Sequence, residues 1–299
     1  MTRLDAPRPF WPRSATTPRT IWGWLRLAIP IVLLAGAAGG VLAWGAADKP
    51  SWKDLDQGLA LAEFEVSSQN TTNHSRIFVL RVDPARFSFK LLCAKEHGKE
   101  RFTTREWSRQ YGLIAAVNAG MYQQDGLTHV GFMKNFKHIN NRWVSRDNAV
   151  LAFNPTDSDL PEVQIIDREC QDFESLKGRY QTLIQGIRMI SCDRRNVWSP
   201  QPDRWSTAAV GMDDSGKVLF LFGQTPLSVH DFINVLLSLP IAIKNAMYLE
   251  GGPQASLYVS ANGVEVDKNG SLESAFDDSD AIRIIFQIPN VIGVVRKGS

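Results

Sequence analysis

The chain has 299 residues, of which 44% are hydrophobic, and its 33 lysines and arginines nearly balance 31 aspartates and glutamates. That length allows one large domain or two small ones, and the apolar share is ample for a core. The net charge of +2, with no basic cluster in the second two-thirds of the chain, argues against a nucleic-acid-binding protein.

The first fifty residues predict a membrane anchor. A basic segment, residues 1–26, precedes the uncharged residues 27–47, which are long enough to cross a bilayer as a helix. Because arginines favour the cytoplasmic side, we expect a single-pass protein of a bacterial inner membrane, with a cytoplasmic basic tail and a periplasmic C-terminal domain. The alternative is a cleaved signal peptide, with Gly45-Ala46-Ala47 at the cleavage site.

The anchor also contains a small-residue motif. Gly36 and Gly40 form a GxxxG pattern, which would allow weak dimerisation of two anchors. The alternative is that these glycines reflect only the small residues common in membrane helices.

Residues 48–59 are predicted to be a short polar tether, and residues 60–299 an exported domain. Residues 76–82 and 87–92 alternate around Asp83-Pro84 and predict a hairpin. Thr103 and Glu106 form a capping box for a helix ending near Gly112. A buried strand, residues 113–117, then leads into Asn118-Ala119-Gly120-Met121.

The rest of the chain is also rich in short strands. Ser228 is predicted to cap a helix that Pro240 limits. Hairpins are predicted at the turns 213–216 and Asn262-Gly263. The predicted strands are residues 149–153, 163–166, 182–184, 207–212, 218–222, 246–249, 256–259, 264–266 and 282–287. Strands thus outnumber helices, and we expect a single α+β domain with a few helices around a mixed, largely antiparallel sheet.

The chain has 3 cysteines, which allow one disulfide and one free thiol. Cys170 with Cys192 is the favoured pair because the segment between them looks rich in loops; Cys93 would then be free. No spacing of ligands matches a zinc site. The sequence requires no cofactor, and a divalent cation stays an open alternative.

Glu250 is the most prominent candidate for chemistry. It follows a continuous apolar run, residues 246–249, and precedes Gly251-Gly252. A buried strand would hold the carboxylate rigidly, and the glycines would let a ligand approach the backbone. The alternative is a polar residue that only ends a strand.

Several segments in order carry a resemblance to the phosphodiester glycosidase family, closest to its bacterial exported branch. They are AAVNAGMY (115–122), the strand end Gln185-Gly186, RWSTAAVGMDDSGKVLFLF (204–222), LSVHDF (227–232) and NAMYLEGGPQASLY (245–258). The resemblance covers roughly residues 60–288. It implies an α+β fold, hydrolysis of a sugar-1-phosphodiester, and a site built from the motif ends, including Gly120, Gln185, Gly251 and Gly252. The chain departs from the family pattern at Glu250, where the family usually has aspartate, and at GIRMI (186–190), where it usually has a Ser-Gly-Pro-like turn.

The residues suggest further roles in such a site. Cleavage of a glycosyl bond commonly uses two carboxyl groups. Glu250 is one candidate, and the second is open among Asp125, Asp203 and Asp231, while Asp213 and Asp214 look like turn residues. Asn118 would hydrogen-bond the sugar or orient the carboxylate, or else only form a turn.

Phosphate and sugar contacts have their own candidates. His230, in the first turn of its helix, would act as a base or donate to a phosphate oxygen, and His129 is a lesser candidate. Arg188 or Arg204 would hold the phosphate as a bidentate fork, the alternative being a surface ion pair. Tryptophans would stack on sugar rings or only pack: Trp143, Trp198 and Trp205.

The sequence therefore predicts a membrane-anchored, extracytoplasmic hydrolase of a phosphate-linked glycan. The competing hypothesis is a non-catalytic glycan-binding or envelope-scaffolding protein on the same fold. A metal-dependent phosphodiesterase is a third alternative.

Overall fold

The computed structural model describes residues 51–67, 74–272 and 285–298. The predicted cytoplasmic tail, the membrane helix and the Gly36/Gly40 motif lie outside these residues. In the part of the chain that is described, no helix is long and apolar enough to cross a membrane.

A large sheet forms the greater part of the described structure, with the strand order β1-β2-β3-β12-β11-β13-β10-β6-β7 and with β8 and β9 attached through β10. Every neighbouring pair of strands in it is antiparallel. Its strands are β1 (Lys53–Asp56), β2 (Leu59–Ser67), β3 (His74–Val82), β6 (Met133–Asn135), β7 (His138–Asn141), β8 (Ala149–Pro155), β9 (Val163–Asp167), β10 (Tyr180–Ile190), β11 (Trp205–Asp213), β12 (Val218–Leu227) and β13 (Ile243–Gly251).

A smaller sheet has the order β15-β14-β5-β16-β4, also antiparallel throughout. Its strands are β4 (Phe87–Cys93), β5 (Ala115–Asn118), β14 (Ser256–Ala261), β15 (Val264–Asn269) and β16 (Asn290–Arg296). Apolar side chains of both sheets meet in one core, where Phe89 of β4 packs on Phe220 of β12 with ring centroids 6.3 Å apart.

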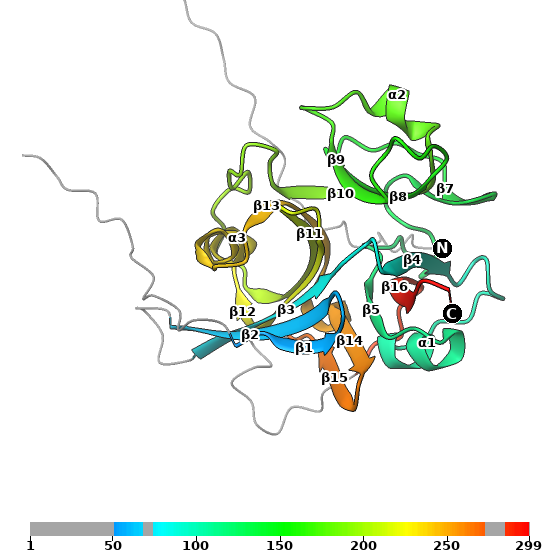
Figure 1. Ribbon diagram of the computed structural model, residues 1–299. Helices are drawn as coiled ribbons and strands as arrows, with labels where there is room; N and C mark the ends of the chain where they lie inside the picture. Colours follow the sequence, from blue (N-terminus) through cyan, green and yellow to red (C-terminus); the bar gives the residue numbers. More distant parts are fainter. Residues whose placement is uncertain (1–50, 68–73, 273–284, 299) are drawn as a thin grey trace, which may run out of the picture. The chain divides into compact units, whose positions relative to one another are not determined.

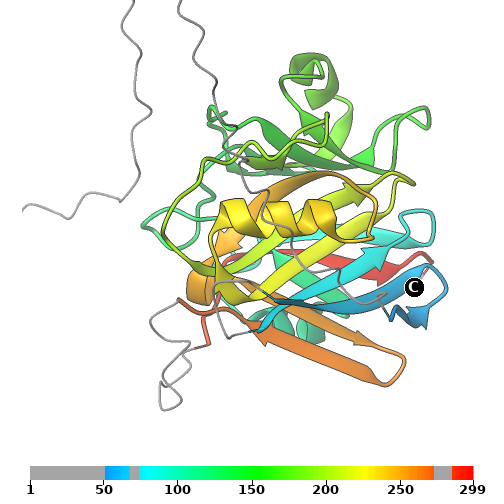
Figure 2. The same ribbon diagram turned by 90° about the vertical axis from the view of Figure 1, so that its left-hand side faces the viewer.

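Short helices cover the outer faces of the sheets (Figures 1 and 2). They are α1 (Thr104–Tyr111), α2 (Phe173–Lys177) and α3 (Val229–Ser238), while the 3-10 turn η1 (Gly252–Gln254) directly follows β13. α1 contacts β5, α2 contacts β10, and α3 contacts β11 and β12. The apolar face of α3, including Phe232 and Leu236, is fully buried against the large sheet.

The predicted helix ends are confirmed. Thr103 and Glu106 form the reciprocal capping box of α1, and Gly112 ends the helix in the left-handed conformation, with φ 65°. The Ser228 hydroxyl accepts from the Asp231 N–H at 3.0 Å at the start of α3. The turn between β11 and β12 and the Asn262-Gly263 hairpin are confirmed too.

The fold is mostly β, and four sequence predictions are corrected. The expected single mixed sheet is two antiparallel sheets. The expected hairpin of residues 76–82 with 87–92 does not form, because β2 and β12 occupy both edges of β3; β4 crosses to the other sheet and pairs with β16. The expected tether contains β1, which pairs with β2. The expected last strand begins outside the described residues, and its residues 285–287 are irregular; β16 takes its place.

Candidate active site

Glu250 lies at the end of β13, a strand flanked by β11 and β10 and buried from Asn245 to Leu249. Its side chain is half-buried, and its Oε1 accepts from the Gly251 N–H at 3.0 Å. Burial outweighs that hydrogen bond and raises the pKa of Glu250 to about 7. A carboxyl group with such a pKa can exchange a proton near neutral pH.

Aromatic rings stand beside this carboxyl group. The Trp205 indole Nε1 donates to the Tyr248 hydroxyl at 3.2 Å, and the Trp198 ring packs on Tyr248 with centroids 5.4 Å apart. Burial and the nearby Glu250 charge raise the pKa of Tyr248, which places the phenol within electrostatic range of the carboxyl group. Trp198 and Trp205 are half-buried.

The two glycines after Glu250 have distinct structural reasons. A Cβ at Gly251 would overlap the Tyr248 hydroxyl and the Trp205 indole. Only glycine therefore leaves room for these two side chains next to the backbone at the end of β13. Gly252 has φ +65°, a left-handed conformation that favours glycine, at the start of η1. The close approach expected of a ligand at Gly251 is therefore made by the protein's own side chains.

Asn118 connects the two motifs that the sequence singled out. Its Nδ2 donates to the Gln254 carbonyl at 2.7 Å, and its Oδ1 accepts from the Ser256 N–H at 2.7 Å and hydroxyl at 3.1 Å. The residue is 1% exposed. Asn118 therefore fixes the segment that follows Glu250 onto the end of β5.

The loop after Asn118 also contributes residues near Glu250. Gly120 has φ +98°, and a Cβ there would overlap the His129 Nε2. Tyr122 forms an isolated β-bridge with His129. Burial and the Glu250 charge raise the pKa of Tyr122, so this phenol also lies within range of the carboxyl group.

His129 is a buried structural residue. Its Nδ1 lies 3.0 Å from both the N–H and the carbonyl of Gly131, and burial lowers its pKa to about 4. A neutral imidazole fixed in this way shapes the wall around Gly120.

The side-chain amide of Gln185 is also fully hydrogen-bonded within the protein. Its Oε1 accepts from the N–H groups of Phe132 and Ser145 at 3.0 and 2.9 Å, and its Nε2 donates to the carbonyls of Ser145 and Asp147 at 3.0 and 2.9 Å. These four bonds use the whole amide. Gln185 thus holds the loop that follows His129, and its side chain has no free group for a substrate.

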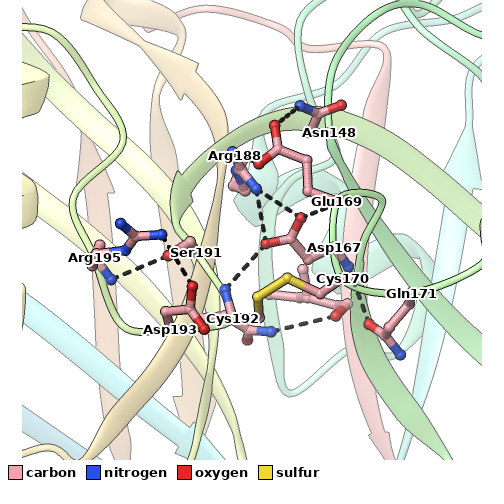
Figure 3. Close-up of a disulfide and its surroundings, with 12 residues drawn as sticks. Asn148, Asp167, Glu169, Cys170, Gln171, Arg188, Ser191, Cys192, Asp193 and Arg195 are labelled. Atoms are coloured by element: carbon pink, nitrogen blue, oxygen red, sulfur yellow. Dashed lines mark hydrogen bonds and ion pairs between the residues drawn. A yellow bond between two sulfur atoms is a disulfide. The ribbon is translucent and has the colours of Figure 1, made fainter.

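Arg188 lies near the disulfide, next to Asp167 and Glu169 (Figure 3). Its Nη1 is 2.9 Å from Asp167 Oδ1, and its Nη2 is 2.7 Å from Glu169 Oε2. The Arg188 and Asp167 side chains are 13% and 3% exposed. The arginine fork expected for a phosphate is therefore occupied by the protein's own carboxylates. The predicted disulfide Cys170–Cys192 is confirmed, and Cys93 is a free, buried thiol.

His230 lies in the first turn of α3, as predicted. Its Nδ1 is 3.3 Å from Asn234 Nδ2 and 3.6 Å from Asp231 Oδ1, and its carbonyl accepts from Asn196 Nδ2. Asn196 also accepts from the N–H of Trp198, so this one residue connects His230 to the aromatic group beside Glu250. Arg204 directly precedes Trp205 in sequence and is half-buried.

None of the candidate second acids is a contact of Glu250. Asp125 accepts from the N–H groups of Leu127 and Thr128 and from the Thr128 hydroxyl, bonds that lower its pKa to about 2. Asp231 accepts from the Ser228 hydroxyl in the α3 cap. Asp203 is exposed in the segment before β11. Burial is what raises the pKa of Glu250, and no charge on another described carboxylate contributes to that rise.

Two residues of this site escaped the sequence interpretation. Tyr122 and Tyr248 lie inside the motif segments 115–122 and 245–258, and only the tertiary structure places their phenols near Glu250. The one available signal was proximity along the chain, since Tyr248 lies two residues before Glu250 at the end of β13. Trp143, by contrast, is 62% exposed in the loop after β7.

Comparisons with known proteins identify the family and the fold. A family model described as phosphodiester glycosidase matches residues 111–295. The zebrafish N-acetylglucosamine-1-phosphodiester alpha-N-acetylglucosaminidase catalytic domain, auto-inhibited by its pro-peptide, has a similar structure, with a TM-score of 0.58 at 14% identity over 84% of this chain and 87% of that one.

Two bacterial structures are similar as well. A hypothetical protein from Synechocystis gives a TM-score of 0.55 at 14% identity over 83% of this chain and 64% of that one. A putative exported protein from Burkholderia pseudomallei gives 0.50 at 11% identity over 76% and 75%. No curated protein matches the sequence. The structural likenesses show a shared fold, and the family match spans more than half of the sequence: the chain belongs to the phosphodiester glycosidase family.

Proposed function

We propose that this protein is a hydrolase that cleaves a sugar-1-phosphodiester or a related phosphate-linked glycan, with Glu250 as the reacting carboxyl group. The observation that carries the proposal is a half-buried carboxyl group with a pKa near 7 at the end of a central strand. Family membership supports the reaction class. The zebrafish relative is named for a sugar-1-phosphodiester, and we extend that class of bond, without the particular sugar, to this chain.

Glu250 is best suited to act as a general base. With a pKa near 7, a large share of the molecules carry the carboxylate at neutral pH, and this carboxylate can take a proton from an attacking water. A phosphate monoester leaves as a stabilised anion, so it needs less protonation than a sugar hydroxyl. One carboxyl group can then suffice where ordinary glycosidases use two.

The surroundings of Glu250 suit a sugar ring. The half-buried Trp198 and Trp205 lie against Tyr248 and offer apolar ring surface beside the carboxyl group. Asn118 acts through the backbone of residues 254–256, which it holds in place. We propose that His230 and Arg204 bind the phosphate group of the substrate. His230 connects to the aromatic group through Asn196, and Arg204 directly precedes Trp205 in the sequence.

An extracytoplasmic location is part of the proposal. The arginines before residues 27–47 support a single-pass anchor in a bacterial inner membrane with a cytoplasmic N-terminus. The Cys170–Cys192 disulfide supports export, because disulfides persist mainly in oxidising compartments. Weak pairing through Gly36 and Gly40 belongs to the same proposal.

One observation favours a second candidate function, non-catalytic glycan binding. In the described part of the chain, Asp125 and Asp231 are held by their own loop and cap, and neither assists Glu250. A binding protein would need the aromatic surface but no second acid.

The decisive experiment assays the purified full-length protein against a panel of sugar-1-phosphodiesters and measures release of reducing sugar. We expect turnover by the wild type and a loss of at least about 100-fold in Glu250→Gln, the scale for losing a proton-transfer group. Glu100→Gln, at an exposed glutamate, is the matched control. Equal turnover in wild type and Glu250→Gln would remove Glu250 from the reaction. Saturable glycan binding without any turnover would favour the binding protein.

A further inference from the structure

Three potential metal ligands gather at a place remote from Glu250 in the chain. The Cys93 sulfur, a carboxylate oxygen of Glu96 and a ring nitrogen of His138 all lie within 4.8 Å of one another. Cys93 ends β4, Glu96 lies in the turn that follows, and His138 begins β7. The cluster therefore joins the small sheet to the edge of the large one.

Backbone and side-chain hydrogen bonds hold these residues in place. The Glu96 N–H donates to the Cys93 carbonyl at 2.9 Å, which folds the turn so that both side chains reach the same side. Asn135, paired with His138 across the β6–β7 hairpin, donates from Nδ2 to the Leu91 carbonyl at 3.1 Å and to Glu96 Oε2 at 2.9 Å. Asn135 thus orients the carboxylate and ties the hairpin to β4, as groups behind metal ligands do.

The cluster contains an unsatisfied polar atom. The Nε2 of His138 is buried and has no hydrogen-bond partner among the described residues. A buried polar atom without a partner costs free energy, and such atoms are uncommon in native proteins. The Cys93 thiol, 0% exposed, makes a weak contact of 3.7 Å with the Met133 thioether. A bound cation would satisfy the imidazole and engage the thiol at once.

We propose that Cys93, Glu96 and His138 bind a divalent cation of the zinc class. One sulfur, one imidazole nitrogen and one carboxylate oxygen form a donor set of borderline softness, which suits Zn²⁺ better than Mg²⁺ or Ca²⁺. Binding converts the Cys93 thiol to a thiolate and releases its proton to solvent. The thiolate and the Glu96 carboxylate then balance the two charges of the ion.

The geometry leaves room for a fourth ligand. Zinc bonds of about 2.0 to 2.3 Å place tetrahedral ligand atoms about 3.5 Å apart, so the three groups, which lie within 4.8 Å of one another, need to close by at most about 1 Å on binding. A cavity of about 360 Å³, lined by Glu96, Asn135 and Phe136 among others, opens next to the carboxylate. Water from this cavity can complete the tetrahedron.

The bound ion would brace a wall of the candidate active site. Asn140, two residues after His138 on the same short strand, accepts from the His129 N–H at 2.8 Å. His129 in turn packs against Gly120. The site is thus structural and does not depend on the proposed hydrolysis.

The test uses untagged full-length protein, stripped with chelator and then equilibrated with Zn²⁺ or Co²⁺. We expect one zinc per chain and, with Co²⁺, a sulfur-to-cobalt charge-transfer band in the near ultraviolet. Because the other two of the 3 cysteines form the disulfide, only Cys93 can supply this thiolate. Absence of both the stoichiometric zinc and the cobalt–thiolate band in the wild type would overturn the proposal without any variant.

Variants then identify the ligands. Cys93→Ala and His138→Gln should each weaken zinc affinity at least about 10-fold, and Cys93→Ala should abolish the cobalt band. Glu96→Gln should weaken binding, and Glu100→Gln, four residues further along and exposed, should not. Circular dichroism of the metal-free variants checks that they are folded. Undiminished zinc binding in folded Cys93→Ala and His138→Gln would contradict the assignment.

Discussion

The Asn118 side chain accepts a 2.7 Å hydrogen bond from the N–H of Ser256, 138 residues further along the chain. The same amide donates to the carbonyl of Gln254 at 2.7 Å. The end of β5 in the small sheet is thereby joined to the segment that leaves β13 in the large sheet. This junction fixes the backbone four residues after Glu250, where the two sheets meet.

Asn118→Asp should damage this junction selectively. The substitution keeps the oxygen that faces Ser256 but turns the donor to Gln254 into an acceptor, which leaves the half-buried Gln254 without this hydrogen bond to its carbonyl. We expect a loss of about 1 to 3 kcal/mol in the free energy of unfolding, measured by urea titration. On a substrate that the wild type cleaves, kcat should fall more than KM rises, because Asn118 positions the backbone that follows Glu250 and does not itself bind the substrate. A large rise in KM with normal stability would instead show direct substrate binding by Asn118.

The pH profile of the reaction should report Glu250. If the carboxylate is the general base, kcat/KM rises with pH and levels off above about 7, following the raised pKa. The measurement is initial rate from pH 5 to 9 on a substrate that the wild type cleaves, with the residual activity of Glu250→Gln as reference. A rate that falls through pH 7 would assign Glu250 the role of general acid.

Glu250 should also make stability depend on pH. Its pKa is about 7 in the folded protein against an ordinary value of 4.5, so between these pH values the folded state binds more protons than the unfolded state. The stability contributed by the neutral carboxyl group is full below pH 4.5 and is lost as pH rises through 7. Glu250→Gln should therefore be more stable than the wild type at pH 8, by up to about 3 kcal/mol.

The quantity to compare is the difference in unfolding free energy between Glu250→Gln and the wild type at each pH. His129, whose pKa burial lowers to about 4, has the opposite effect below its ordinary value of 6.5, and it cancels in that difference. Thermal unfolding of both proteins from pH 5 to 8 provides the data. A difference that does not grow with pH would contradict the raised pKa.

Gly251→Ala should perturb the aromatic group beside Glu250. The new Cβ would overlap the Tyr248 hydroxyl and the Trp205 indole, so one ring must move. We expect a loss of about 1 to 3 kcal/mol in unfolding free energy, seen by denaturant titration, and a shift in tryptophan fluorescence. Gly178→Ala is the control, because a Cβ there meets nothing within 4 Å and the change should stay within about 0.5 kcal/mol. Equal behaviour of the two variants would disprove the steric argument.

Arg188→Met should reduce stability and leave substrate binding unchanged. The change leaves Asp167, whose side chain is 3% exposed, without its guanidinium, at a cost of about 3 to 5 kcal/mol. Adding Asp167→Asn should recover much of this loss, because the unpaired charge is then removed. The measurements are unfolding free energy and KM. A stable Arg188→Met protein with a strongly raised KM would restore the phosphate role that the sequence suggested.

Local signals in the sequence predicted much of this structure. The capping residues Thr103 and Ser228, the Asn262-Gly263 turn and the apolar run before Glu250 all specify conformation through neighbours within a few residues. Such effects need no knowledge of the rest of the chain. The motif segments with Asn118 and Glu250 were likewise sufficient to indicate the family.

Pairing over long distances was decided by the tertiary structure. The alternation of residues 76–82 and 87–92 fits a hairpin as well as it fits two sheets, and only the occupation of both edges of β3 excludes the hairpin. The partner of Arg188 was also decided by the tertiary structure. An arginine can bind either a phosphate or a carboxylate, and the fold places the Asp167 carboxylate against Arg188.

The contrast between two sets of residues shows the physical reason. The sequence by itself determined the helix caps, the hairpin turns, many of the strands and the place of Glu250 at a strand end, because those features depend on local sterics and periodicity. The tertiary structure alone decided that burial raises the pKa of Glu250 and that Cys93, Glu96 and His138 meet. Desolvation and ligand geometry depend on which segments, far apart in sequence, exclude water from the same place.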